Sequence, residues 1–105
     1  MNVDFSKDFA KSVRRLSGKI LQSVIAMIDE VRDAQSIEQI SNCKKIEALN
    51  NVYLNNVYRI RIGDRRAFFV LHIQIEGDLV MFEYVFNRGE AYDKKNMQKL
   101  RNKDC

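Results

Sequence analysis

Residues 58 to 71 read Tyr-Arg-Ile-Arg-Ile-Gly-Asp-Arg-Arg-Ala-Phe-Phe-Val-Leu, and this stretch decides the fold. Apolar and basic residues alternate from Tyr58 to Ile62, Gly63-Asp64 is a plausible two-residue turn, and a second strand follows from Arg66 to Ile75. A two-residue turn places Ile62 opposite Arg65 and Arg61 opposite Arg66. Two like charges facing each other cost stability in a sheet, so an anionic ligand such as phosphate would relieve the pair.

A second turn at Gly77-Asp78 extends this hairpin to a strand from Leu79 to Phe86 and places His72 opposite Glu83. One face of the predicted sheet is almost wholly apolar and forms the expected core: Tyr58, Ile60, Ile62, Ala67, Phe69, Leu71, Ile73, Ile75, Val80, Phe82, Tyr84 and Phe86. The other face mixes cations with exposed apolar groups: Arg59, Arg61, Arg66, Phe68, Val70, His72, Gln74, Met81, Glu83 and Val85. Such a face suits nucleic acid or a partner segment, and the alternative is an ordinary solvated sheet face.

The segments around the sheet predict an α+β layering. A short strand is expected at Asn2–Phe5, followed by a helix from Lys7 with Ser6 as its N-cap and an interruption at Ser17-Gly18. A second helix, 19–33, carries an apolar stripe that would cover the core face: Ile20, Leu21, Val24, Ile25, Ile28 and Val31. A turn or two of helix is expected at 36–40, and a short C-terminal tail helix at 90–102. The expected fold is thus a short N-terminal strand and two N-terminal helices packed on a small antiparallel sheet.

Composition limits the classes of protein that this chain can belong to. The 105 residues fit one domain spanning 1–105, and no apolar run approaches the ~20 residues that span a bilayer, so no membrane association is expected. Cys43 and Cys105 are expected to be free thiols in a reducing compartment, the cytoplasm. With one histidine and no metal-ligand spacing, neither a metal nor another cofactor is expected. The excess positive charge lies wholly in residues 44–105, with twelve Lys/Arg against eight Asp/Glu, which indicates an acidic partner.

Two motifs then resemble the signatures of a known family. Residues 58–66 are similar to the "YRIRxGDYR" signature of the RelE/ParE toxin superfamily, and residues 85–92, Val-Phe-Asn-Arg-Gly-Glu-Ala-Tyr, resemble its "VxHRxxxY" signature. Residues 45–49, Lys-Ile-Glu-Ala-Leu, stand where these toxins carry a "KxL" element before the sheet. Order and spacing together make the match more specific than any one motif.

The resemblance implies the toxin of a type II toxin-antitoxin system. RelE-like members are ribosome-dependent endoribonucleases that cleave mRNA and so block translation, whereas ParE-like members inhibit DNA gyrase by binding alone. Both are neutralised by an antitoxin, here expected to be acidic and to form a hetero-oligomer with the toxin. The RelE-like activity is the leading hypothesis. A ParE-like inhibitor and an inactive binding module with the toxin fold remain the alternatives.

The resemblance also implies roles for particular residues in metal-independent RNA cleavage. In this reaction the 2′-hydroxyl attacks the adjacent phosphate, so the site needs positive charge, a proton acceptor and a proton donor. The expected catalytic residues are Arg66 and Arg88 for charge stabilisation, Tyr92 for base stacking or proton transfer, and Glu47 as a base, with RNA-binding roles for Arg59, Arg61, Arg65 and Lys45. The alternative for Glu47 is an exposed glutamate at a helix end, and for Tyr92 an anchor for the tail.

Two positions depart from the signatures: Arg65 replaces a tyrosine, and Asn87 replaces a histidine. Without that imidazole, the isolated protein is expected to be a poor nuclease that depends on the ribosome to align the message. The antitoxin is expected to cover the Arg59/Arg61/Arg66 face, with apolar anchors meeting Phe68, Val70 or Val85.

Overall fold

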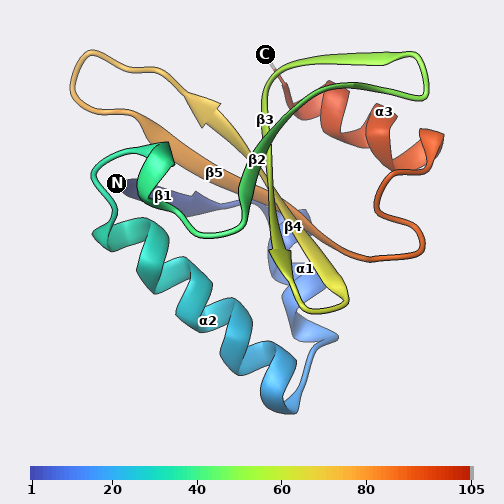
Figure 1. Ribbon diagram of the computed structural model, residues 1–105, viewed down its shortest axis with the longest axis horizontal. Helices are drawn as coiled ribbons and strands as arrows, with labels where there is room; N and C mark the ends of the chain where they lie inside the picture. Colours follow the sequence, from blue (N-terminus) through green and yellow to red (C-terminus); the bar gives the residue numbers. More distant parts are fainter. Residues whose placement is uncertain (105) are drawn as a thin grey trace.

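The computed structural model describes residues 1–104 and has the expected α+β architecture (Figure 1). Its elements follow in the order β1 (Asn2–Phe5), α1 (Lys7–Arg14), α2 (Gly18–Asp33), a 3₁₀ turn (Ile37–Gln39), β2 (Cys43–Leu49), β3 (Val52–Ile62), β4 (Arg65–His72), β5 (Leu79–Asn87) and α3 (Lys94–Lys103). All elements expected from the sequence are present. The strand β2 was not expected, because only Ile46 in it is buried and no alternation marks it.

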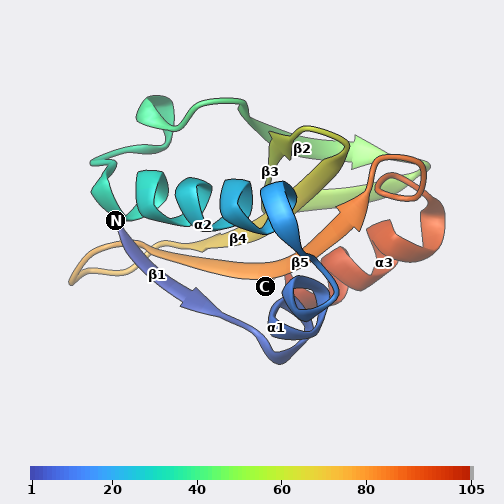
Figure 2. The same ribbon diagram turned by 90° about the horizontal axis from the view of Figure 1, so that it is seen from below.

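The five strands form one sheet in the order β1-β5-β4-β3-β2. Strands β2 to β5 pair antiparallel, but β1 runs parallel to β5, so the sheet is mixed rather than purely antiparallel. The β1 strand stops at Phe5, where Ser6 Oγ accepts a hydrogen bond from Phe9 N at 3.0 Å and caps α1 as expected. Because α1 takes over where β1 ends, it packs beside the second half of β5 (Figure 2).

Both faces of the sheet are covered, and Figure 1 shows the sheet passing between α2 and α3. On one face α1 and α2 pack against a cluster that includes Phe9, Val24, Phe69 and Phe82. On the other face α3 places Met97 and Leu100 on a second cluster of strand residues: Ile46, Val52, Leu54, Val57, Phe68, Val70 and Phe86. The expectation that Phe68 and Val70 are exposed is therefore wrong, because both are fully buried in the second cluster.

The first hairpin has the expected register and the second does not. Arg61 pairs with Arg66 and Ile62 with Arg65 across the turn at Gly63-Asp64. In the second hairpin β4 ends at His72, which pairs with Leu79 rather than Glu83. Residues 73–78 form a loop closed by its own bonds, from Gly77 N to Gln74 O and from Gln74 N to Asp78 Oδ1. Ile73 and Ile75, expected in the core, are therefore exposed in that loop.

A bulge in β5 changes which side chains face which helices. The register shifts between Phe68 and Phe69, so Phe68 pairs with Tyr84 while Phe69 pairs with Phe82, and Glu83 has no pair. The extra residue sends Tyr84 and Phe86 to the α3 face and Val85 to the α2 face, opposite to the expectation. In α2 the expected stripe is partly wrong as well, because Ile25 is half exposed and Met27 is buried in its place.

No helix in residues 1–104 is long and apolar enough to cross a membrane. Cys43 is a free thiol, as expected, and Cys105 lies outside the described residues.

Candidate RNA-binding and cleavage site

Three arginines share the α3 face of the sheet beside the β3–β4 turn. Arg59 and Arg61 are two positions apart on β3, and Arg61 lies directly opposite Arg66 on β4. Within residues 1–104 none of the three forms an ion pair shorter than 4 Å, since the cations that do are Arg32, Arg65 and Lys103. The face therefore presents uncompensated positive charge, as the sequence predicted.

Arg66 is fixed in place by the turn that precedes it. Its side chain is 9% exposed, and Nη1 donates to the carbonyl oxygens of Gly63 and Arg65, each at 2.9 Å. Its Nε is buried and has no hydrogen-bond partner among the described residues. A guanidinium has five N–H donors, so Arg66 retains donors for a further acceptor while its orientation is already set.

Arg59 and Tyr92 are in direct contact. Arg59 Nη1 donates to Tyr92 Oη at 3.3 Å, and the Tyr92 ring meets Phe68 edge-on at 6.0 Å between centroids. The Nε of Arg59 is a second buried donor that no described group satisfies. Asn50, in the β2–β3 turn, donates from Nδ2 to the backbone oxygen of Tyr92 and so ties the loop before α3 to that hairpin.

Glu47 lies at the same place, on a strand rather than at a helix end. It belongs to β2, where the register shifts between Ile46 and Ala48, so Glu47 is the unpaired residue of the irregularity. A hollow of about 250 Å³ is lined by Lys44–Leu49 together with Arg59 and Tyr92. The structure thus brings Glu47, Arg59 and Tyr92 together.

The two lysines before Glu47 have different positions. Lys44 pairs with Arg59 and faces the site, although neither sequence motif marks it. Lys45 pairs with Tyr58, so its side chain lies on the α2 side of the sheet, although Lys45 is among the residues that line the hollow. Recognition of β2 would have identified Lys44, because it is two residues before the buried Ile46 and shares its face.

Arg88 adjoins the site through its backbone. Its N–H donates to Asp64 O at 2.8 Å, so the residue after β5 is tied to the β3–β4 turn beside Arg66. The Arg88 side chain is exposed and, within residues 1–104, has no ion-pair partner within 4 Å.

Arg65 does not belong to this face. It pairs with Asn87, and its Nη1 donates to Asn87 Oδ1 at 3.1 Å and lies 3.2 Å from Asp64 Oδ2. The two residues that depart from the family signatures are therefore bonded partners, on the opposite face from Arg66. The side chain at position 87 consequently does not point to the Arg66 site.

Neither His72 nor Cys43 is placed for chemistry at this site. His72 is at the far end of β4 from Arg66, and six residues of strand correspond to about 20 Å. Burial raises the pKa of the Cys43 thiol to about 11, so near neutral pH it is protonated and not nucleophilic.

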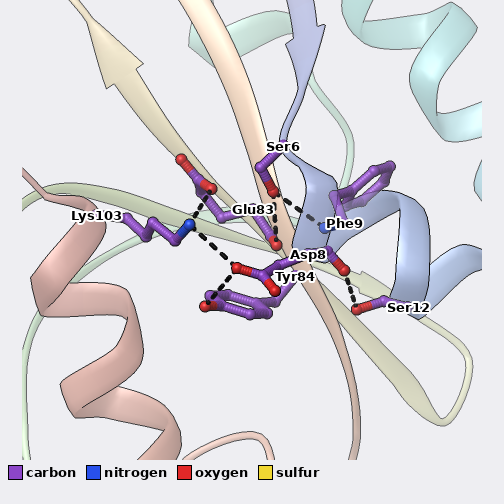
Figure 3. Close-up of polar contacts among 7 residues, drawn as sticks. All are labelled: Ser6, Asp8, Phe9, Ser12, Glu83, Tyr84 and Lys103. Atoms are coloured by element: carbon purple, nitrogen blue, oxygen red, sulfur yellow. Dashed lines mark hydrogen bonds and ion pairs between the residues drawn. The ribbon is translucent and has the colours of Figure 1, made fainter.

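A polar cluster ties the C-terminal end of α3 to α1 and β5 (Figure 3). Lys103 Nζ lies 3.1 Å from Asp8 Oδ2 of α1 and 3.7 Å from Glu83 Oε1 of the bulge, and Tyr84 Oη donates to Asp8 Oδ2 at 3.3 Å. The hydrogen bond from Lys103 lowers the pKa of Asp8, and the same bond raises the pKa of Lys103. The backbone N–H groups of Asn55 and Asn56 donate to the carboxylate of Asp104.

The arrangement can bind a phosphodiester and stabilise charge on it. Arginines donate paired hydrogen bonds to phosphate oxygens, and partly buried arginines act in a medium where charge is poorly screened. Glu47 is a possible proton acceptor in the same hollow, and the Tyr92 hydroxyl is a possible donor.

Comparison with known proteins agrees with the overall fold. The chain is 31% identical over 94 residues to a protein named toxin RelE3 from Methanocaldococcus jannaschii. The aligned region covers 89% of this chain and 97% of that protein. It is similar to the crystal structure of the RelB-RelE antitoxin-toxin complex from Methanococcus jannaschii, with TM-score 0.62 and 25% identity over 85% of this chain and 94% of that one. The RelE-RelB complex from Pyrococcus horikoshii has the same TM-score at 17% identity, covering 86% and 97%, which shows the shared fold. No family model matches the chain.

The chain thus has the α+β fold of the RelE proteins in these toxin-antitoxin structures. The extent of the match to toxin RelE3 shows that this chain belongs to the RelE toxin family.

Proposed function

We propose that this protein is the toxin of a toxin-antitoxin pair and cleaves messenger RNA on the ribosome. The observation that carries the proposal is the cluster of Arg59, Arg61 and Arg66, which share one face without acidic partners and include two buried Nε donors that no described group satisfies. Such donors cost free energy unless a ligand accepts from them. A phosphate group is the ligand whose geometry suits them.

The reaction follows from these residues. Glu47 accepts the proton of the 2′-hydroxyl, whose oxygen forms a bond to phosphorus as the bond to the 5′-oxygen breaks, and the Tyr92 hydroxyl gives a proton to that leaving oxygen. The products are a 2′,3′-cyclic phosphate and a 5′-hydroxyl. Arg66 and Arg88 stabilise the charge that develops on the phosphorus oxygens. Arg59, Arg61 and Lys44 hold the RNA backbone.

The cognate partner in this proposal is an acidic antitoxin that neutralises the toxin. The similar structures are a RelB-RelE antitoxin-toxin complex from Methanococcus jannaschii and a RelE-RelB complex from Pyrococcus horikoshii. The structure changes the expected mode of binding, because Phe68 and Val70 lie under α3 and Val85 faces α2. The antitoxin therefore meets the arginine face through charge and hydrogen bonds, without those three anchors.

The decisive experiment compares Arg66→Ala with the unchanged protein on programmed ribosomes. Removing one such donor from a transition state costs about a hundredfold or more in rate, so we expect at least that loss of cleavage in single-turnover assays. The matched control is Arg101→Ala, which removes an exposed arginine on α3 that does not line the hollow. Fragments must end in a cyclic phosphate and persist with EDTA.

Two further arms test the alternatives. Free RNA should be cut far more slowly than ribosome-bound message, because the side chains alone do not align the 2′-hydroxyl with its leaving group. Gyrase with supercoiled DNA should be unaffected. Intact message together with trapped gyrase-DNA complexes would overturn the proposal in favour of an inhibitor that acts by binding.

A further inference from the structure

A second basic surface lies between α1 and α3, beside the second half of β5. A cleft of about 420 Å³ is bounded by α1, by the start of β4 and end of β5, and by the segment that leads into α3 with its first turns. Four cations line it: Lys11 of α1, Arg15 just after α1, Arg65 of β4 and Lys99 of α3. The cleavage site proposed above includes none of these four cations, so the cleft is a separate feature.

The positive charge of the cleft is poorly compensated. Lys11, Arg15 and Lys99 are exposed, and in the part of the chain that the structure describes none has an acidic group within 4 Å. The lining has two acidic residues, Asp8 and Glu90. Asp8 is already paired with Lys103 at 3.1 Å, and its electrostatic interaction with Lys11 acts only at longer range. The cleft therefore retains a net positive charge.

Arg65 gives the cleft one ordered donor. Its Nη1 is held by Asn87 Oδ1 and Asp64 Oδ2, its side chain is 26% exposed, and its other N–H groups make no bond to a described residue. Asn87 uses its oxygen for this bond, which leaves the amide N–H₂ as a donor in the same lining. The two departures from the family signatures thus build one wall of the cleft.

We propose that this cleft binds phosphate groups of RNA, as a second contact that is separate from the cleavage site. The inference rests on the proposed function, because it takes RNA as the target. Polar groups dominate the lining; of its apolar and aromatic members Val85 and Phe86 are buried, and Leu16 and Tyr84 are partly buried. An acidic peptide would find little apolar surface to anchor it, whereas a nucleic-acid backbone is held mainly by cations.

The position of the cleft suits a strand that continues past the cleavage site. Arg65 and Arg66 are consecutive in β4, so their side chains point to opposite faces of the sheet. Arg66 faces the cleavage site and Arg65 faces the cleft. RNA that passes over the β3–β4 turn would meet both, and the exposed Arg88 lies at that turn.

The test measures the binding of a labelled single-stranded oligouridine of about 12 nucleotides, a length that fits one small domain. Lys11→Gln combined with Arg15→Gln removes two cations from the cleft, and Lys99→Gln tests the α3 side. Lys19→Gln combined with Arg101→Gln is charge-matched, exposed and outside the cleft. All proteins carry Arg66→Ala, so that binding is read without cleavage, and circular dichroism checks that each is folded.

We expect the cleft pair to weaken binding by about tenfold at low salt and to reduce the slope of log Kd against log salt by about 1.4, since each lost contact to a single strand contributes about 0.7. Lys99→Gln should reduce the slope by about half as much. Equal effects of the cleft pair and its control would overturn the proposal. The proposal would also be overturned if the cleft pair abolished binding of an oligoglutamate peptide and left RNA binding unchanged. That result would assign the cleft to an acidic protein segment. Failure of the cleavage assay alone would remove the proposed function and leave this binding result standing.

Discussion

At the scale of residues, Arg65 and Asn87 show how two departures from a motif can be read together. Each taken alone suggested a weakened catalytic site. The structure places them opposite each other in β4 and β5, with a hydrogen bond of 3.1 Å, on the face away from Arg66. Because strand side chains alternate between faces, a substitution at position 87 does not remove a group from the arginine face.

This placement predicts the result of restoring the histidine. Asn87→His should change the rate of cleavage on programmed ribosomes by less than about tenfold, an effect smaller than 1.4 kcal/mol, because the imidazole would lie in the cleft. The measurement is a single-turnover rate as a function of pH. A larger gain, with a new inflection near the usual imidazole pKa of about 6.5, would show that position 87 does reach the reacting groups.

At the scale of elements, α3 is the helix that covers the apolar part of the face on which Arg59, Arg61 and Arg66 lie. Its buried Met97 and Leu100 cover Phe68 and Val70, and its last residues are tied to α1 and β5 through Lys103. The tail helix was predicted from sequence as a polar segment with few anchors. Its consequence for the sheet was not predicted, because no local pattern tells which face a short helix will cover.

The polar cluster at Lys103 predicts how stability depends on pH. The pKa of Asp8 is lowered in the folded protein, so its contribution is present above the usual value of 3.8 and is lost as pH falls through the lower, folded value. Asp8→Asn should therefore be less stable than the unchanged protein near pH 6, and should lose less stability on acidification from about pH 5 to about pH 2. Denaturant unfolding at each pH measures this difference.

Asp33→Asn is the control for this experiment, since Asp33 is exposed on α2 and belongs to no ion pair within residues 1–104. It should lose stability with acid as the unchanged protein does. An acid dependence of Asp8→Asn identical to that of the unchanged protein would show that the Lys103 contact does not contribute in solution.

The elements also show which parts of the fold a single sequence can specify. Capping at Ser6, the turn at Gly63-Asp64 and the alternation from Tyr58 to Ile62 are local signals, and the structure agrees with each. The bulge at Glu83 and the six-residue loop after His72 are set by cross-strand pairing and by the loop's own bonds. The bulge, which depends on pairing between strands, moved Tyr84, Phe86 and Val85 to unexpected faces.

The candidate site divides in the same way. Arg59, Arg61 and Arg66 follow from strand alternation, so their common face could be predicted. Lys44 and Asn50 could not, because Lys44 depends on the unrecognised strand β2 and Asn50 reaches Tyr92 from 42 positions away in the chain.

At the scale of the whole molecule, the charge asymmetry of the sequence becomes two separate basic surfaces at one end of the sheet. The net charge is +4. The arginine face belongs to the sheet residues that held the excess of positive charge, whereas the cleft also uses Lys11 and Arg15 from the N-terminal part, whose charge is balanced. Folding therefore assembles a basic surface that the count along the chain did not show.

Two separate surfaces on one RNA make a quantitative prediction for their combination. Arg61→Gln removes an exposed cation of the arginine face, and Lys11→Gln with Arg15→Gln removes two from the cleft. Sites farther apart than about 10 Å with no shared partner usually add within about 0.5 kcal/mol, so the changes in binding free energy for the oligouridine should sum in the combined variant. The reductions in salt slope should sum as well, to about 2.1 for three lost contacts. The control replaces the cleft pair by Lys19→Gln with Arg101→Gln, which should add little to Arg61→Gln. If the combined variant instead binds no more weakly than the weaker of its two parents, the cations compete for the same phosphates, and the sheet end carries one RNA surface rather than two.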